Sequence, residues 1–159
     1  MSTFNALTTS QINNLFPSNS GFSGAFAADR MPSPKAFPWV MIVNTDPHDE
    51  PGEHWVTIVL KDNHKAVYFD SFGFPPLVPQ IQRYLELNAF NGIKFNCSTL
   101  QHPNTTSCGY WCVLFVHHYL KGWSLKKFIS FFSGRLGVDL VRNERKLFKY
   151  FRHESSTRD

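Results

Sequence analysis

The sequence predicts an α+β domain, because its strand patterns lie in the middle of the chain and its helical patterns lie at both ends. Apolar runs of strand length cover 39–43, 55–60 and 66–69. The chain has 159 residues, which suffices for one ordinary domain but not for two, and it shows no internal repeat or long linker. We therefore expect a single domain over residues 1–159.

The first expected element is a short helix. Residues 8–10, Thr-Thr-Ser, are helix-capping types, apolar residues follow them at helical spacing, and Pro17 ends the pattern. Residues 17–38 are rich in Ser, Gly and Pro, which predicts a long irregular connection. The continuous apolar run 39–43 then predicts a buried strand.

A hairpin is expected next. The strands 55–60 and 66–69 are joined by the turn 61–64. If this turn has four residues, His54 lies within one position of Asp70 at the open end of the hairpin, and a one-residue slip would place the two directly opposite.

The rest of the chain is mostly helical. Ser124 is the expected N-cap of the penultimate helix. In the last helix, Leu140, Leu147, Phe148 and Phe151 share one face. The expected elements are a helix at 80–90, a strand at 93–97, a polar loop at 98–107, and helices at 108–121, 124–133 and 139–152.

Composition excludes several protein classes. Apolar residues make up 42% and charged residues 18%, which is unlike a disordered chain. The longest apolar run, 110–116, is far shorter than the roughly 20 residues that span a bilayer. No Lys or Arg precedes Arg30 and no apolar stretch follows Met1, so we expect no signal peptide. Three cysteines, a low and odd number, favour a reducing compartment over secretion.

Positive charge is concentrated near the C-terminal end. Between Lys126 and Arg152 lie eight Lys or Arg residues and only two acidic ones, whereas the whole chain carries a net charge of +4. The remainder of the chain is therefore slightly acidic. Such a basic face is expected either to bind a polyanion or simply to be a solvated surface.

Cys108 is the candidate nucleophile. It begins the apolar helix 108–121, and the free N–H groups of a first helical turn favour a thiolate at that position. At the open end of the hairpin, His54 and Asp70 are either a chance pair on the surface or a candidate base with the carboxylate that orients it. Gln101, seven residues earlier, is either an ordinary loop glutamine or an amide that donates, together with the Cys108 N–H, to a developing oxyanion. Cys112 is expected to be an ordinary core cysteine.

Three segments around these residues resemble the site motifs of the adenovirus-type cysteine proteases, the adenain-like family. The resemblance covers residues 20–153 and extends to the wider superfamily of SUMO and ubiquitin-like-protein proteases. The segments are Gly52-Glu53-His54-Trp55, Tyr68-Phe69-Asp70-Ser71-Phe72-Gly73-Phe74 and Gln101-His102-Pro103-Asn104-Thr105-Thr106-Ser107-Cys108-Gly109.

The resemblance implies a fold, roles and substrates. The fold would be a mixed central sheet flanked by helices, with the nucleophile at the N-terminus of a central helix. His54, Asp70, Cys108 and Gln101 would be the catalytic residues. Trp55 and Gly109 would contact the substrate, expected to be a Gly-containing motif in viral capsid or core precursor proteins. Trp55 is equally expected to be a core residue.

The resemblance also concerns partners. Family members use DNA and an activating peptide as cofactors; the chemistry itself needs no cofactor and no metal. DNA contacts would fall on Arg142, Arg145, Lys149 and Arg152, and Cys97 is the nearest counterpart of the cysteine that bonds the peptide. We expect a monomer located in the virion and the host nucleus or cytoplasm, not at membranes. Two departures are that the family commonly has Glu at the position of Asp70, and that the stretch from Asp70 to Cys108 is shorter here.

Alternative functions remain open. The same chemistry would serve a deconjugating protease for ubiquitin-like modifiers. A zinc module built from Cys97, His102, Cys108 and Cys112 has a spacing unlike familiar structural sites. A DNA-binding domain without catalysis would leave the His, Asp, Gln and Cys arrangement unexplained.

Overall fold

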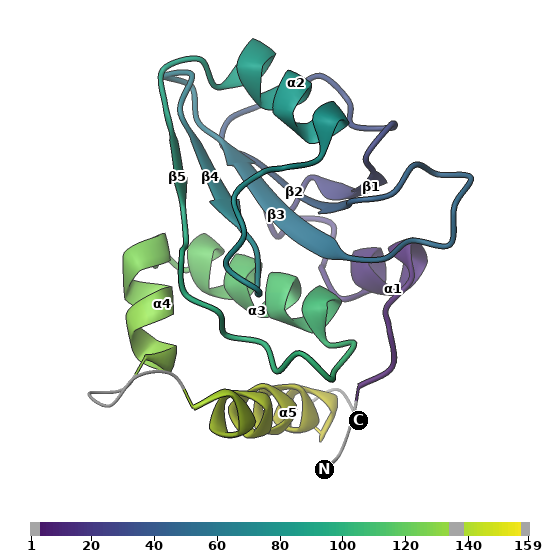
Figure 1. Cartoon of the computed structure of the whole chain (residues 1–159), viewed down its shortest axis with the longest axis vertical. Helices are drawn as coiled ribbons and strands as arrows, with labels where there is room; N and C mark the ends of the chain where they lie inside the picture. Colours follow the sequence, from purple (N-terminus) through teal and green to yellow (C-terminus); the bar gives the residue numbers. More distant parts are fainter. Residues whose placement is uncertain (1–3, 134–138, 157–159) are drawn as a thin grey trace.

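The computed structural model describes residues 4–133 and 139–156, which form one mixed sheet with helices on both faces (Figure 1). The five strands lie in the order β1-β2-β3-β4-β5; the inner three pair antiparallel and each edge strand runs parallel to its neighbour. The predicted α+β class is confirmed. The elements are α1 (Thr9–Asn14), β1 (Gly24–Ala27), β2 (Trp39–Asn44), β3 (Trp55–Leu60), β4 (Ala66–Phe69), α2 (Pro79–Asn88), β5 (Ile93–Phe95), α3 (Cys108–Leu120), α4 (Leu125–Phe132) and α5 (Leu140–Ser156).

Strand β1 lies within the stretch 17–38, where the sequence analysis expected only irregular chain. It has four residues and pairs in parallel with the edge of β2, Ala25 beside Ile42. On the other side its Ala25 N–H donates to Asn13 Oδ1 at 3.0 Å, so α1 also holds it. Short strands of small residues lack a period-two pattern, and this one forms because its neighbours supply its hydrogen bonds.

The hairpin of β3 and β4 has a register one residue away from the expected one. Leu60 pairs with Ala66, and the Lys61 N–H donates to the Lys65 carbonyl at 2.9 Å. The loop therefore holds three residues instead of four. His64 closes it with a positive φ of 58°, which is the geometry of a three-residue hairpin loop.

The two faces of the sheet bury separate cores. Helices α1, α3, α4 and α5 pack on one face around residues such as Ile42, Phe69 and Phe115, whereas α2 covers the other face (Figure 1). Helix α3 lies between the sheet and the C-terminal helices. Its residues 108 and 109 and 111–116 are all buried, so the helix that begins at Cys108 is held from several sides.

The helix caps agree with the sequence analysis. Thr8 and Gln11 form a reciprocal capping box at the start of α1, and the Ser124 hydroxyl accepts a hydrogen bond from the Lys127 N–H at the start of α4. Over the described parts of the chain, no helix is both long and apolar enough to cross a membrane.

Candidate active site

The structure brings the four predicted catalytic residues together at one end of α3. Cys108 is the first residue of that helix, His54 directly precedes β3, Asp70 directly follows β4, and Gln101 lies in the loop before α3. His54, Gln101 and Cys108 line the same cleft, whose volume is about 680 Å³. A cleft of this size accommodates a peptide segment or a small ligand.

His54 and Asp70 meet despite the altered register. His54 Nε2 lies 2.9 Å from Asp70 Oδ1. Both residues lie just beyond the paired ends of their strands, where the ladder no longer dictates which residues face each other. Asp70 instead begins a turn: its Oδ1 accepts from the Phe72 N–H at 2.8 Å, and its carbonyl accepts from the Gly73 N–H at 2.9 Å. The turn aims the carboxylate at the imidazole.

Asn96 holds the backbone of Asp70 and was missed by the sequence analysis. Its Oδ1 accepts from the Asp70 N–H at 3.1 Å, and its Nδ2 donates to the Asp70 carbonyl at 2.6 Å and to the Ser98 carbonyl at 3.2 Å. Asn96 directly follows β5, which runs parallel to β4, so both strands end at the same edge of the sheet. The expected strand 93–97 concealed this residue, because the structure ends β5 at Phe95.

The environment of His54 favours its protonated form. Burial disfavours the charge, but the hydrogen bonds to Asp70 and Cys108 and the charges of both outweigh it and raise the pKa of His54 to about 9. The Phe72 ring stacks on the imidazole with ring centres 5.1 Å apart. A protonated imidazole at the cleft is a group that donates a proton in acid–base chemistry.

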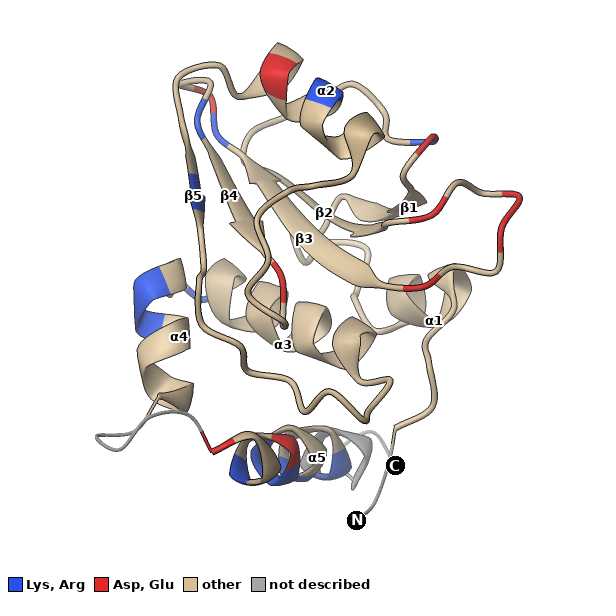
Figure 2. Ribbon diagram, viewed as in Figure 1, with Lys and Arg blue, Asp and Glu red and all other residues tan. Residues whose placement is uncertain are grey.

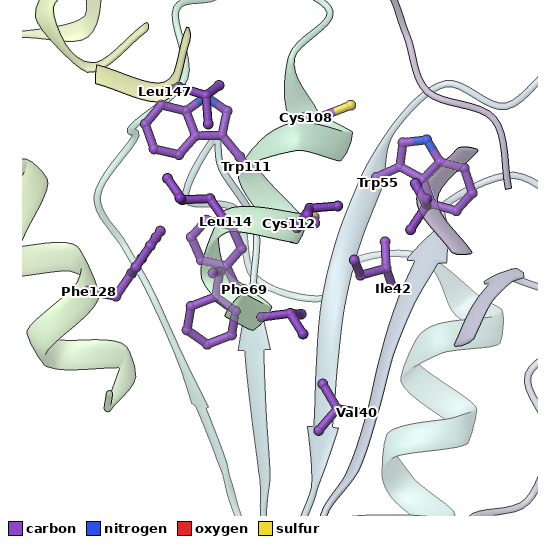
Figure 3. Close-up of a cluster of buried hydrophobic side chains, with 14 of the residues drawn as sticks. Val40, Ile42, Trp55, Phe69, Cys108, Trp111, Cys112, Leu114, Phe128 and Leu147 are labelled. Atoms are coloured by element: carbon purple, nitrogen blue, oxygen red, sulfur yellow. The ribbon is translucent and has the colours of Figure 1, made fainter. Parts of the chain in front are cut away.

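The three cysteines occupy different environments. Cys108 lies at the beginning of α3 and at the cleft, whereas Cys112, one turn later, is surrounded by core side chains (Figure 3). Burial raises the pKa of the Cys112 thiol well above its ordinary value. Cys97 is exposed, just beyond β5. The geometry therefore separates a candidate nucleophile from a core cysteine; the role of Cys97 stays a prediction.

Gln101 is buried and firmly oriented. The Ser71 hydroxyl donates to its Oε1 at 2.6 Å. Its Nε2 donates to the Thr105 carbonyl at 3.1 Å and to Thr105 Oγ1 at 3.2 Å. Because Ser71 takes the oxygen end of the amide, the NH₂ group is turned toward the loop that leads to Cys108.

The residues predicted to contact substrate differ in position. Trp55 lines the cleft, although it is only 6% exposed, and its Nε1 donates to the Leu7 carbonyl at 2.9 Å. A Cβ at Gly109 would lie 3.2 Å from Leu7 and from Trp55 Cδ1. Because Gly109 has no side chain, Leu7 of the same chain can pack against it. Contact between Gly109 and a substrate stays a prediction.

The N-terminal segment forms part of the cleft wall, which the sequence analysis did not foresee. Residues 6–9 line the cleft. The segment is tied down upstream, where Thr106 Oγ1 donates to the Phe4 carbonyl at 2.8 Å and the Phe4 ring lies 4.0 Å from the Tyr110 ring. These contacts join residues about a hundred positions apart, which no local pattern reveals.

Basic residues are concentrated on α4 and α5, and others lie on α2, on β5 and in the hairpin between β3 and β4 (Figure 2). The acidic loop between β2 and β3 lies away from α4 and α5. Leu147 and Phe151 are buried against the core as expected. Two other lysines cover aromatic rings: Lys127 Nζ lies 4.3 Å from the Trp123 ring and Lys146 Nζ lies 4.8 Å from the Phe131 ring. The four predicted DNA contacts, Arg142, Arg145, Lys149 and Arg152, are all exposed, and Arg135 lies outside the described residues.

Metal ligands are not gathered in the part of the chain that the structure describes, where no group of three or more His, Cys, Asp or Glu side chains is placed to hold an ion. The zinc module considered from the sequence therefore receives no support.

Comparison with known proteins supports the resemblance. The adenovirus endoprotease family matches residues 31–132. The protease of bovine adenovirus 2 is 32% identical over 91 residues, which cover 50% of this chain and 44% of that protein. The protease of ovine adenovirus D serotype 7 (isolate OAV287) is 28% identical over 132 residues, which cover 70% of this chain and 65% of that protein. The chain thus spans less than two thirds of the length of both relatives.

Two solved structures share the fold. ChlaDub1 from Chlamydia trachomatis superposes with a TM-score of 0.54 at 20% identity, over 76% of this chain and 61% of that one. The central domain of the Legionella pneumophila protein Lpg1148 superposes with a TM-score of 0.52 at 14% identity, over 97% of this chain and 98% of that domain. At such low identity the likeness concerns the fold alone.

Proposed function

Because the chain belongs to the adenovirus endoprotease family, we propose that it is a thiol endopeptidase with Cys108 as nucleophile, His54 as acid–base group and Asp70 as the orienting carboxylate. The observation that carries the proposal is the position of His54, whose Nε2 lies 2.9 Å from Asp70 Oδ1 and which lines the same cleft as Cys108. His54 and Cys108 line a cleft, and Cys108 lies at the positive end of a buried helix.

The chemistry follows from this geometry. Cys108 Sγ attacks the scissile carbonyl carbon, and the carbonyl π electrons move to oxygen. His54 then gives its proton to the leaving amine as the C–N bond breaks, which leaves an acyl thioester on Cys108. Neutral His54 next removes a proton from water as the water oxygen adds to the thioester carbonyl carbon. The C–S bond then breaks, which releases the acid and returns Cys108 as the leaving thiolate beside protonated His54. Asp70 keeps the imidazole oriented and stabilises its charge in both halves.

The oxyanion would be stabilised by the Cys108 N–H and by Gln101. Both hydrogens of Gln101 Nε2 have acceptors on Thr105. One of these bonds must therefore be exchanged for the substrate oxygen as the tetrahedral intermediate forms. The bond from Ser71 keeps the amide from turning over during that exchange.

For the substrate we propose a polypeptide cut after Gly in a Gly-containing motif, in the structural precursors of a virus or virus-like element, with the enzyme packaged in the virion. Trp55 at the cleft and the N-terminal wall at residues 6–9 support a narrow groove. A narrow groove admits glycine more readily than residues with bulky side chains.

Labelling with an electrophilic probe tests the enzyme class. A Gly-terminated peptide vinyl sulfone is expected to modify Cys108 and to spare Cys97 and Cys112, as read by peptide mass mapping. Cys108→Ala should abolish labelling and lower peptide hydrolysis by about 10⁴-fold or more. Preferential labelling of Cys112 would overturn the assignment. A probe made from a folded ubiquitin-like modifier separates the alternative: faster reaction with it than with Gly-containing peptides would indicate deconjugation.

We also propose that DNA binds to the outer face of α5 and stimulates the enzyme. Arg142, Arg145, Lys149 and Arg152 are exposed there, and the acidic loop lies elsewhere in the molecule (Figure 2). With about four phosphate contacts, the logarithm of affinity should fall with the logarithm of salt concentration at a slope of about −3 to −4.

Fluorescence anisotropy with duplex DNA at several salt concentrations measures this slope. The double change Arg142→Ala and Arg145→Ala should weaken binding and flatten the slope by about two. The matched control, Lys65→Ala with Arg83→Ala, removes two exposed positive charges from the hairpin and α2 and should leave the slope unchanged. No binding by the unaltered protein at about 50 mM salt would leave the basic face as a solvated surface.

A further inference from the structure

A buried carboxylate outside the predicted catalytic set contacts the loop that precedes the nucleophile. Glu144 of α5 is only 6% exposed. A buried carboxylate is costly unless its oxygens are hydrogen-bonded, and here neutral donors satisfy them. These donors are the His102 N–H at 3.0 Å, Thr105 Oγ1 at 3.3 Å, Ser107 Oγ at 2.9 and 3.0 Å, and Trp111 Nε1 at 3.2 Å.

These donors are concentrated in a short stretch of chain. Three of the four belong to 102–107, the loop between Gln101 and Cys108, and the fourth is on the first turn of α3. The neighbouring Asn143 donates to the Leu100 carbonyl at 3.3 Å, so two consecutive residues of α5 hold both ends of this loop. The family match ends at residue 132, before either of them.

Ser107 shows what this contact changes at the start of α3. A serine just before a helix normally accepts a hydrogen bond from an N–H of the first turn. Here Ser107 makes no such capping bond, and its hydroxyl donates to Glu144. The side chain that would compete for the N–H groups beside Cys108 is therefore drawn away from them.

We propose that Glu144 is a positioning residue for the oxyanion site: it holds the loop 102–107 so that the Gln101 amide and the Cys108 N–H converge on one point, and it keeps the Ser107 hydroxyl from capping the helix. This inference rests on the proposed peptidase function. Glu144 acts through Ser107, Thr105 and the loop backbone, and it does not touch the substrate.

The test compares Glu144→Gln with Glu86→Gln, the same chemical change at an exposed position on α2. We expect Glu144→Gln to lower kcat by about 10²-fold with KM changed less than about threefold, since small displacements of catalytic donors have effects of this size. A peptide aldehyde adds to Cys108 and forms a hemithioacetal, whose tetrahedral carbon carries an oxygen like that of the reaction intermediate. Binding of this aldehyde should weaken in parallel with kcat. Alkylation of Cys108 by iodoacetamide passes through no tetrahedral intermediate. Its rate in Glu144→Gln should therefore stay within about twofold of the rate in the unaltered protein.

A purely structural role predicts a different outcome. If Glu144 only stabilises the fold, Glu144→Gln would lower the rates of alkylation and of peptide hydrolysis by similar factors. That result would overturn the proposal. An unchanged kcat would overturn it as well. If Glu144→Gln does not fold, Ser107→Ala removes one anchor of the loop without freeing a hydroxyl to cap the helix. It should show the same split between hydrolysis and alkylation, with a smaller loss of kcat.

A readout independent of hydrolysis separates the two proposals. Hydrogen exchange of the backbone in 101–107 should accelerate in Glu144→Gln and stay unchanged in Glu86→Gln, because the His102 N–H loses its carboxylate acceptor. Unchanged exchange would refute the clamp. If the unaltered protein cleaves no peptide, the proposed function fails, and the exchange experiment still decides whether Glu144 holds the loop.

Discussion

The two sides of the candidate active site are built differently. His54 and Asp70 lie at the ends of adjacent strands, and their supports, Phe72 and Asn96, come from the same sheet edge. Gln101 and Cys108 are connected by a loop whose main anchor, Glu144, lies on the last helix, 37 residues beyond Ser107. The strand-end side is thus supported mainly by the sheet, whereas the loop side depends on how α5 docks.

This difference predicts separable defects. Changes on the strand-end side should alter the protonation of His54 and therefore the pH profile. Changes on the loop side should alter stabilisation of the oxyanion and leave the pH profile in place. Three substitutions test this division, beginning with the largest expected effect.

Asp70→Asn should lower kcat by roughly 10²–10⁴-fold while the protein stays folded, because the imidazole loses its orienting charge. It should also change the pH profile. In the unaltered protein, activity should fall as pH rises through about 9, where His54 loses its proton. Removing Asp70 removes an influence that raises the pKa of His54, so this limb should move to lower pH. Measurement of kcat/KM against pH checks both effects.

The control for Asp70→Asn is Asp62→Asn, at an exposed position in the hairpin loop. A basic limb that remains in place in Asp70→Asn would contradict the assignment of that limb to the pair.

Gln101→Ala should lower kcat by roughly 10²–10³-fold if Gln101 supplies one oxyanion donor. The basic limb should not move, since Gln101 has no contact with the imidazole in the hydrogen bonds of the described structure. Steady-state kinetics with saturating peptide checks the change against Gln80→Ala, at an exposed position on α2. Unaltered turnover would remove Gln101 from the site.

Asn96→Ala should have the smallest effect on rate, about 10-fold in kcat, because Asp70 keeps its bond from Phe72 but loses its backbone clamp. Stability should fall by about 1–3 kcal/mol, since the Asp70 N–H and carbonyl lose a buried partner. Urea denaturation and a pH profile measure the two effects, with Asn19→Ala, at an exposed position, as control. A large rate loss with an unmoved basic limb would place Asn96 on the loop side of the comparison.

Cys108 and Gln101 illustrate how far the sequence leads toward the site. Helix-start position and spacing single out Cys108, and the resemblance assigns Gln101, His54 and Asp70 beside it. The sequence does not reveal that Asn96 clamps Asp70, because an asparagine after a short strand is an ordinary loop residue until β4 and β5 are known to be parallel. It does not reveal Glu144 either, since an acidic residue within a basic helix is typical of a solvated surface.

The sequence by itself determined the inner strands and the caps of α1 and α4, because these depend on residues that are neighbours in the chain. Only the tertiary structure decided the hairpin register, the pairing of β1, the cleft wall at residues 6–9 and the buried environment of Glu144. Each of these results from hydrogen bonds or packing between segments far apart in the chain. A local pattern shows that a donor or an acceptor is present, but the fold selects its partner.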